Sequence, residues 1–328
     1  MTPCLSALKD WRPNLQIIAV LEPLAAPLLD GHPLVDRMIV VEKNAASRLA
    51  AIRTLRNSRP QIAFNLHGGT TAMLMASLCG ARYSVGYDSL PGSWMANRRA
   101  PGPDKVLGRQ KIHSVEQQLA LLTWAGVPLP VKPRLNIEVS RPASERALAA
   151  LKTINIDRSD GNSHNKAERF ALIAPGAAFE SKRWGASGFA AVIDYLAEHW
   201  SLRSLIVTGP GQKELAEDVA AQTRSGPLVL PHLKLDEVVA LTAELGAVFV
   251  GNDSGLMHIA AAVGCPIVAV FGSSNPDVWH PWTDSPTSVL GGERLQKDTD
   301  VKGSIVRIST NEVIAAVEEV LRKVGSEQ

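Results

Sequence analysis

The chain has 328 residues, more than one hydrophobic core usually supports, so we expect two domains. Its composition, 45% hydrophobic and 20% charged, is ordinary for a globular protein, and it contains neither an apolar run of membrane-spanning length nor a signal-peptide pattern. Its cysteines, Cys4, Cys79 and Cys265, lie far apart and match no zinc spacing, which predicts reduced packing residues in a cytoplasmic protein.

The net charge of +2 is unevenly distributed. Residues 1–140 contain 16 Lys and Arg against 9 Asp and Glu, and the remainder contains 18 against 23. A basic first half suits an anionic partner. No recognition motif indicates nucleic acid, so two interpretations remain: contact with a phosphorylated lipid or acidic sugar at a membrane surface, or a merely solvated basic face.

In the first half, short apolar runs alternate with helix-like stretches, as in a parallel sheet with helices on both faces. We predict strands at residues 16–21, 38–41, 62–65, 83–86 and 134–139, and helices at residues 3–11, 45–58, 71–79, 114–125 and 144–153. The polar stretch Arg158–Glu168 is predicted to be an exposed linker between domains of residues 1–157 and 168–328.

The second half repeats the alternation and predicts a second α/β unit. Its strands are expected at residues 170–174, 204–208, 228–229, 247–250, 267–271 and 287–290, and its helices at residues 188–199, 212–223, 235–244 and 310–324.

The segment from Gly251 to Gly264 lies between two apolar runs and predicts a strand, a tight turn, a short helix and a strand. Such a turn lies at the carboxyl edge of the sheet, where open α/β sheets bind ligands, and the helix N-terminus would face an anion such as a diphosphate. An ordinary capped crossover helix would explain the alanines and glycines. It would not explain why Asp253, Ser254 and His258 gather within one turn.

The stretch from Asn252 to Pro276 resembles the donor-site signature of the heptosyltransferases, glycosyltransferase family 9, which use ADP-heptose in lipopolysaccharide inner-core assembly. Further matches follow in the family's order at residues 2–9, 65–68, 85–87, 113–117, 174–177 and 182–184. The resemblance covers nearly the whole chain. It implies a GT-B fold, two Rossmann-like domains facing across a cleft, and inverting heptose transfer to an inner-core acceptor without metal or other cofactor.

One departure from the family pattern concerns the N-terminus. Family members usually begin with a strand and a Gly-Asp turn before the helix that starts here at Thr2. That strand and that Asp, the family's candidate base, have no counterpart in this sequence. We therefore expect a first domain that lacks its first strand and is less stable than the second. Without that Asp, the sequence does not decide whether this chain is active.

Transfer from a nucleotide sugar requires neutralisation of the departing diphosphate. Lys182 follows a predicted strand and loop, and the resemblance assigns it to the phosphates; Lys182 and Asp253 are the predicted catalytic residues. Arg183 is a further donor-binding candidate, although two adjacent cations in a loop are often merely solvated.

Three further residues are predicted to bind the donor. Ser254 and Gly255 would offer backbone N–H groups to the diphosphate, and His258 would donate to a phosphate oxygen. Asp253 would orient the sugar or cap the helix, since its charge repels phosphate.

The loop from Thr208 to Glu214 superficially matches a dinucleotide fingerprint but lacks its third glycine, so NAD is disfavoured. The resemblance places Glu214 on the nucleotide ribose, and a helix-dipole glutamate is the alternative. Asp298-Thr299-Asp300 has the form of a metal-binding DxD, but it lies in a polar loop and is interpreted as solvated, so no metal site is predicted.

On the acceptor side, Asn65 and His67 end a predicted strand and His113 begins a helix. Arg98 and Arg99 supply positive charge for a lipid-linked anionic saccharide, with peripheral contact at the inner face of the inner membrane. Two other functions remain open: another GT-B nucleotide-sugar enzyme, such as an epimerase, and a non-catalytic nucleotide-sugar binder.

Overall fold

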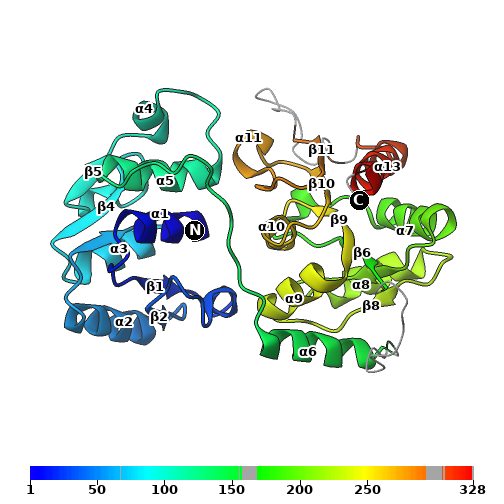
Figure 1. The fold of residues 1–328 in the computed structure, drawn as a ribbon, viewed down its shortest axis with the longest axis horizontal. Coiled ribbons are helices and arrows are strands. Elements are labelled where there is room, and N and C mark those ends of the chain that lie inside the picture. Colours follow the sequence, from blue (N-terminus) through cyan, green and yellow to red (C-terminus); the bar gives the residue numbers. More distant parts are fainter. Residues whose placement is uncertain (67, 155, 157–167, 293–304, 306, 327–328) are drawn as a thin grey trace. The chain divides into compact units, whose positions relative to one another are not determined.

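The computed structural model describes residues 1–66, 68–154, 156, 168–292, 305 and 307–326. The chain divides into two compact units, Met1–Asn136 and Ile137–Gln328 (Figure 1). The division precedes the linker predicted from sequence, because helix α6 (Arg141–Lys152) packs along helix α9 (Leu235–Leu245) of the second unit. Arg146 of α6 donates a 2.7 Å hydrogen bond to Glu237 and forms a second ion pair with Asp236.

The first unit alternates short strands with helices. Its elements are α1 (Thr2–Trp11), β1 (Ile18–Leu21), η1 (Ala26–Leu29), β2 (Arg37–Val40), α2 (Ala45–Asn57), β3 (Ile62–Phe64), α3 (Thr70–Leu78), β4 (Tyr83–Tyr87), η2 (Ser93–Met95), β5 (Arg98–Ala100), α4 (Pro103–Leu107) and α5 (Ser114–Trp124).

The strand predicted at residues 134–139 does not form, so that prediction was wrong. The Asn136 backbone is held by side chains instead of a neighbouring strand. Its N–H donates to Thr2 Oγ1 at 3.1 Å, and its carbonyl oxygen lies 3.2 Å from His32 Nε2.

The parallel sheet of the first unit is divided into two pieces, β1–β2 and β3–β4–β5. Its strand side chains are correspondingly open to solvent: Val20, Val40 and Ile62 are 38%, 44% and 40% exposed. A parallel sheet normally has both faces covered. The apolar side chains of these strands are therefore only partly buried in the core.

The second unit contains one continuous sheet. Its elements after α6 are β6 (Phe170–Ala174), η3 (Glu180–Lys182), α7 (Ala186–Trp200), β7 (Ser204–Ile206), α8 (Lys213–Ala221), β8 (Leu228–Val229), α9, β9 (Gly246–Asn252), α10 (Gly255–Ala262), β10 (Ile267–Phe271), α11 (Pro276–Trp279), β11 (Thr287–Gly291) and α13 (Thr310–Ser326).

All neighbouring strands of this sheet are parallel, in the order β11–β10–β9–β6–β7–β8. The chain builds outward from β6 in one direction through β8, then returns to place β9 on the other side of β6. This is the doubly wound arrangement, whose ligands bind at the carboxyl ends of the strands where the order reverses. That switch point lies between β6 and β9.

Helices cover both faces of the second sheet. Helices α7, α8 and α13 pack together on one face, while α9 and α10 pack on the other (Figure 1). Every residue of β6 and β10 is consequently buried. This dry, rigid sheet fixes the loops that leave its carboxyl edge.

The three cysteines are free and buried, as the packing interpretation predicts. Burial raises the pKa of the Cys4 thiol to about 11 and that of Cys265 to about 12, which keeps both protonated. Among the described residues, no helix combines the length and the hydrophobicity needed to cross a bilayer.

Candidate functional site

Two loops meet at the switch point, one after β6 and one after β9, and Asn252 joins them. This last residue of β9 is completely buried. Its Oδ1 accepts a hydrogen bond from the Trp184 backbone N–H at 3.0 Å, and its Nδ2 donates to the Pro175 carbonyl oxygen at 2.7 Å. Asn252 therefore holds the loop after β6 near both ends, a role that the sequence motif did not reveal.

The loop after β6 places Lys182 against Asp253. Lys182 Nζ lies 2.7 Å from Asp253 Oδ2, with the lysine side chain 24% exposed and the aspartate 5% exposed. The Ser274 hydroxyl donates to the same carboxylate oxygen. Loops that follow β6, β9 and β10 therefore converge on one buried carboxylate, and the two predicted catalytic residues contact each other.

Gly272 allows this convergence. A Cβ atom at this position would lie 2.2 Å from the Ser181 carbonyl oxygen and 3.0 Å from Lys182 Cα. Because real side-chain atoms do not approach a backbone so closely, only glycine lets the Lys182 loop rest directly on the end of β10.

The N-terminus of α10 lies beside the ion pair. Ser254 is its N-cap residue, but no side chain caps the helix, and Ser254 Oγ is buried without a partner among the described residues. A Cβ atom on Gly255, the first helical residue, would meet nothing within 4 Å. Uncapped N–H groups, the positive end of the helix dipole and an unpartnered hydroxyl together form a site for an anion.

His258 lies one turn into α10 and is half-buried. Its ring packs edge-on against Trp279, with centroids 6.4 Å apart and planes at 62°. Burial is the main cause that lowers the pKa of His258; the Asp253 charge raises this pKa and Lys182 lowers it. The imidazole is therefore neutral at neutral pH and can donate one N–H to a ligand. Trp279, which the sequence did not single out, lies on α11 and is 45% exposed.

Arg183 is half-buried and binds the backbone. Its Nε and Nη2 donate to the Ala177 carbonyl oxygen at 3.1 and 3.0 Å. Gln212 donates to the same oxygen at 3.2 Å and accepts from the Gly209 N–H. Arg183 and Gln212 thus brace the loops after β6 and β7. Glu214 lies in the first turn of α8, after the strand next to β6, with an exposed side chain.

In the first unit, two predicted acceptor residues have structural roles. Asn65 is buried at the end of β3, where its Oδ1 accepts from the Gly68 N–H at 2.9 Å. His113 is 2% exposed and is the N-cap of α5, its Nδ1 accepting from the Val115 N–H at 3.1 Å. The His113 ring therefore caps α5 and is buried there, and its predicted contact with an acceptor stays a prediction. His67 lies outside the described residues.

Arg98 and Arg99, the two arginines predicted on the acceptor side, lie exposed on β5. The Arg98 guanidinium lies 5.0 Å from the centre of the Tyr83 ring, at the start of β4. It is therefore directed toward the amino ends of the strands, whereas Asn65 lies at a carboxyl end. The structure does not bring Arg98 and Asn65 together.

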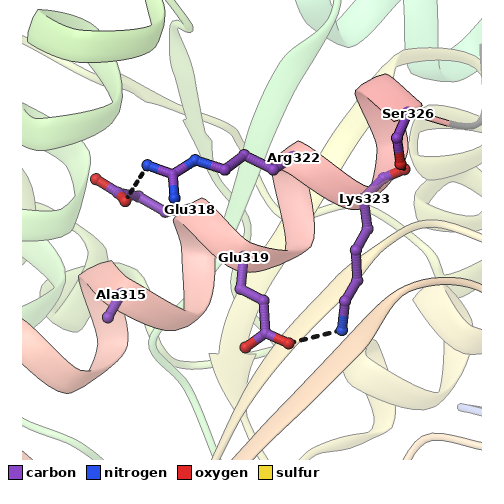
Figure 2. Close-up of a pocket in the computed structure, with 6 residues that line it drawn as sticks. All are labelled: Ala315, Glu318, Glu319, Arg322, Lys323 and Ser326. Carbon is purple, nitrogen blue, oxygen red and sulfur yellow. Dashed lines mark hydrogen bonds and ion pairs between the residues drawn. The ribbon is translucent and has the colours of Figure 1, made fainter.

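No metal site is found in the described part of the chain, in which no three His, Cys, Asp or Glu residues form a suitable group. The DxD-like Asp298–Asp300 lies outside the described residues. A cavity of about 530 Å³ lies along α13 (Figure 2). Its walls include the pairs Glu318–Arg322 and Glu319–Lys323, both 2.6 Å. These are ordinary i,i+4 pairs of a solvated helix surface, with no residue from the switch point.

The chain is similar to known proteins over nearly its whole length. The chain is 25% identical to lipopolysaccharide heptosyltransferase 3 of Escherichia coli over 98% of its own length and 94% of the relative. The solved E. coli ADP-heptose lps heptosyltransferase II is 22% identical, with a TM-score of 0.77 over 99% of this chain and 95% of that one.

A second solved structure, E. coli heptosyltransferase WaaC with ADP, is 19% identical, with a TM-score of 0.71 over 97% of this chain and 94% of that one. These similarities show that the fold is GT-B. The sequence profile of Glycosyltransferase family 9 (heptosyltransferase) matches residues 48–306. The chain therefore belongs to glycosyltransferase family 9, a family of heptosyltransferase enzymes.

Proposed function

We propose that this chain transfers heptose from ADP-heptose to a lipopolysaccharide inner-core acceptor, with inversion at the anomeric carbon and without a metal. The observation that carries the proposal is the Lys182–Asp253 pair beside the uncapped N-terminus of α10, at the switch point of the second sheet. The similarity to a heptosyltransferase solved with ADP supports ADP as the nucleotide of the donor.

The second unit can neutralise a leaving diphosphate with its own groups. Lys182 supplies the cation, and the first N–H groups of α10 supply oriented donors that need no rearrangement as charge develops. Ser254 Oγ and the neutral His258 ring offer two further donors beside that helix end. Asp253 holds the Lys182 ammonium in place through the 2.7 Å contact.

The nucleoside end of the donor would extend toward β7, where Glu214 is our candidate for the ribose hydroxyls. Its carboxylate is exposed at the start of α8, and a carboxylate accepts hydrogen bonds from a sugar diol. Asp253 remains a candidate for orienting the heptose, through whichever lone pairs Lys182 and Ser274 leave free.

The class of acceptor is inferred from the charge of the first unit. The first unit has the excess of basic residues, which suits an anionic, lipid-linked saccharide on the cytoplasmic side of the inner membrane. Our candidates on this side are Asn65, His67, His113, Arg98 and Arg99.

The test is an ADP-release assay on the full chain with ADP-heptose and a lipopolysaccharide preparation that lacks inner-core heptose. We expect release that requires both substrates and persists in EDTA, and a product of inverted anomeric configuration by NMR. ADP binding in calorimetry without any release would indicate a nucleotide-sugar binder instead. Preference for UDP- or GDP-sugars would indicate a different GT-B enzyme.

A further inference from the structure

The excess positive charge of the first unit comes from one segment. Residues 51–111 contain nine Lys and Arg against two acidic residues, Asp88 and Asp104, a balance of +7. Residues 1–50 contain five of each sign and residues 112–140 two of each, so both are neutral. The basic character therefore belongs to the region from the second half of α2 to Lys111.

The same segment exposes large apolar side chains. On α3, Leu74 and Leu78 lie one turn apart on one face and are 41% and 40% exposed. Trp94, in η2, is 77% exposed. We call these three residues the α3 surface.

Helix α3 and η2 are held side by side. The Ser77 hydroxyl donates to the Met95 carbonyl oxygen at 2.8 Å, and a Cβ atom on Gly92 would lie 3.2 Å from the Thr70 side chain. At about 100° per residue, Leu74 lies about 40° from Thr70 and 60° from Ser77 around the helix. The outward face of α3 therefore adjoins the loop that carries Trp94.

One guanidinium group contacts the C-terminal end of α3, and two others lie at the start of β4, the strand that follows α3 in the chain. Arg56 Nε donates to the Leu78 carbonyl oxygen at 2.7 Å, and Arg82 and Arg98 lie 5.2 and 5.0 Å from the centre of the Tyr83 ring. Within the described residues, none of the three arginines forms an ion pair with a carboxylate. Their positive charge is therefore available to an external anion.

We propose that the α3 surface, with Arg56, Arg82 and Arg98 at its edge, binds the anionic surface of a phospholipid bilayer. Tryptophan prefers the level of the lipid headgroups, leucine the acyl chains below, and arginine the phosphates. Because the net +7 and the exposed apolar side chains share one segment, the charge matches a bilayer better than it matches a neutral protein partner.

The surface deepens the proposed function, because a lipid-linked acceptor would lie in such a bilayer. It also gives a role to Arg98, which the structure separates from Asn65. The binding test below uses neither donor nor acceptor, so its failure would leave heptose transfer untouched, and failure of transfer would leave bilayer binding untouched.

The experiment is co-sedimentation of the full chain with vesicles of phosphatidylcholine, with or without phosphatidylglycerol. We expect binding only to the anionic vesicles, decreasing with added salt. R82Q/R98Q, which leaves the Arg56 bond intact, should lower the partition coefficient about 25-fold, and adding R56Q should bring the loss to about a hundredfold. L74Q/L78Q/W94S should lower it about tenfold or more.

Matched controls lie in the second unit. R141Q/R203Q/R322Q removes three exposed arginines and the same charge, and W200S removes a tryptophan that is 36% exposed. Both controls should bind vesicles like the unmodified chain, and all variants should melt near its temperature. Three results would each overturn the proposal. The controls could lose as much vesicle binding as the test variants, or L74Q/L78Q/W94S could bind vesicles as well as the unmodified chain. The third result is that the unmodified chain forms a dimer in solution and L74Q/L78Q/W94S does not.

Discussion

The Lys182–Asp253 ion pair allows the roles of Lys182 in stability and in transfer to be separated. Replacing Lys182 by methionine keeps most of the side-chain volume and removes the ammonium group. Asp253 would then remain 5% exposed, and the Ser274 hydroxyl would be its one remaining side-chain donor among the described residues. Loss of the ammonium group should thus have two effects. It should lower the stability of the fold and weaken the interaction with a bound diphosphate.

The cost to folding follows from the geometry. Two unit charges 2.7 Å apart attract by about 6 kcal/mol at an effective dielectric constant of about 20. Desolvation offsets much of this attraction, and breaking a buried pair typically costs about 3–5 kcal/mol. Because Lys182 is 24% exposed, we expect Lys182→Met to lower the free energy of unfolding by about 2–3 kcal/mol.

The cost to transfer is separate. Loss of a charge contact to the leaving diphosphate should raise the barrier by about 2–4 kcal/mol, on the order of a hundredfold or more in kcat/KM. The double variant Lys182→Met/Asp253→Asn buries no unpaired charge. In urea titrations it should therefore recover most of the lost unfolding free energy, while ADP release remains slow.

Lys323→Met, on α13, is the matched control and should change unfolding by less than about 0.5 kcal/mol and leave ADP release unchanged. If the double variant regained the original kcat/KM, Lys182 would serve only to neutralise Asp253, and its assignment to the diphosphate would be refuted.

Three further predictions concern the site and the two units. Because burial lowers the pKa of His258 below 6.5, only the unfolded chain gains a proton as pH first falls. The free energy of unfolding should therefore lose nothing to His258 above pH 6.5 and should decrease below it. An equal decrease in His258→Gln, measured by urea titration, would contradict this. Gly272→Val should abolish ADP binding in calorimetry by displacing the Lys182 loop; retained affinity would mean that the loop adapts. Hydrogen exchange should be faster in β1 and β3 than in β6 and β9, and equal protection would show that the divided sheet carries no penalty.

The second sheet was largely predictable from sequence because its strands are buried on both faces. Continuous apolar runs at residues 170–174 and 267–271 coincide with β6 and β10. In the first unit β5 was missed, since its sequence, Arg98-Arg99-Ala100, contains no apolar run and forms a strand only by pairing with β4. Tertiary pairing decided that element, not local pattern.

The candidate site was predictable in position but not in its contacts. The rule that ligands bind at carboxyl ends brought Lys182 and Asp253 to one edge. Their direct contact joins residues 71 positions apart in the chain and depends on Asn252 and Gly272, whose roles appear only when the loops are seen together. A sequence shows the residue type, but not whether Arg183 faces a phosphate or, as here, a backbone carbonyl.

The two units differ in how they use positive charge. At the switch point, Lys182 is balanced by Asp253 and His258 is neutral, so oriented N–H groups of α10 must supply much of the attraction for an anion. Such short-range donors are screened little by salt. Arg56, Arg82 and Arg98, which form no ion pair with a carboxylate in the part of the chain that the structure describes, instead present their charge to solvent, where attraction falls steeply with ionic strength. Nucleotide binding and bilayer binding should therefore respond to salt very differently, because one relies on fixed dipoles and the other on free charge.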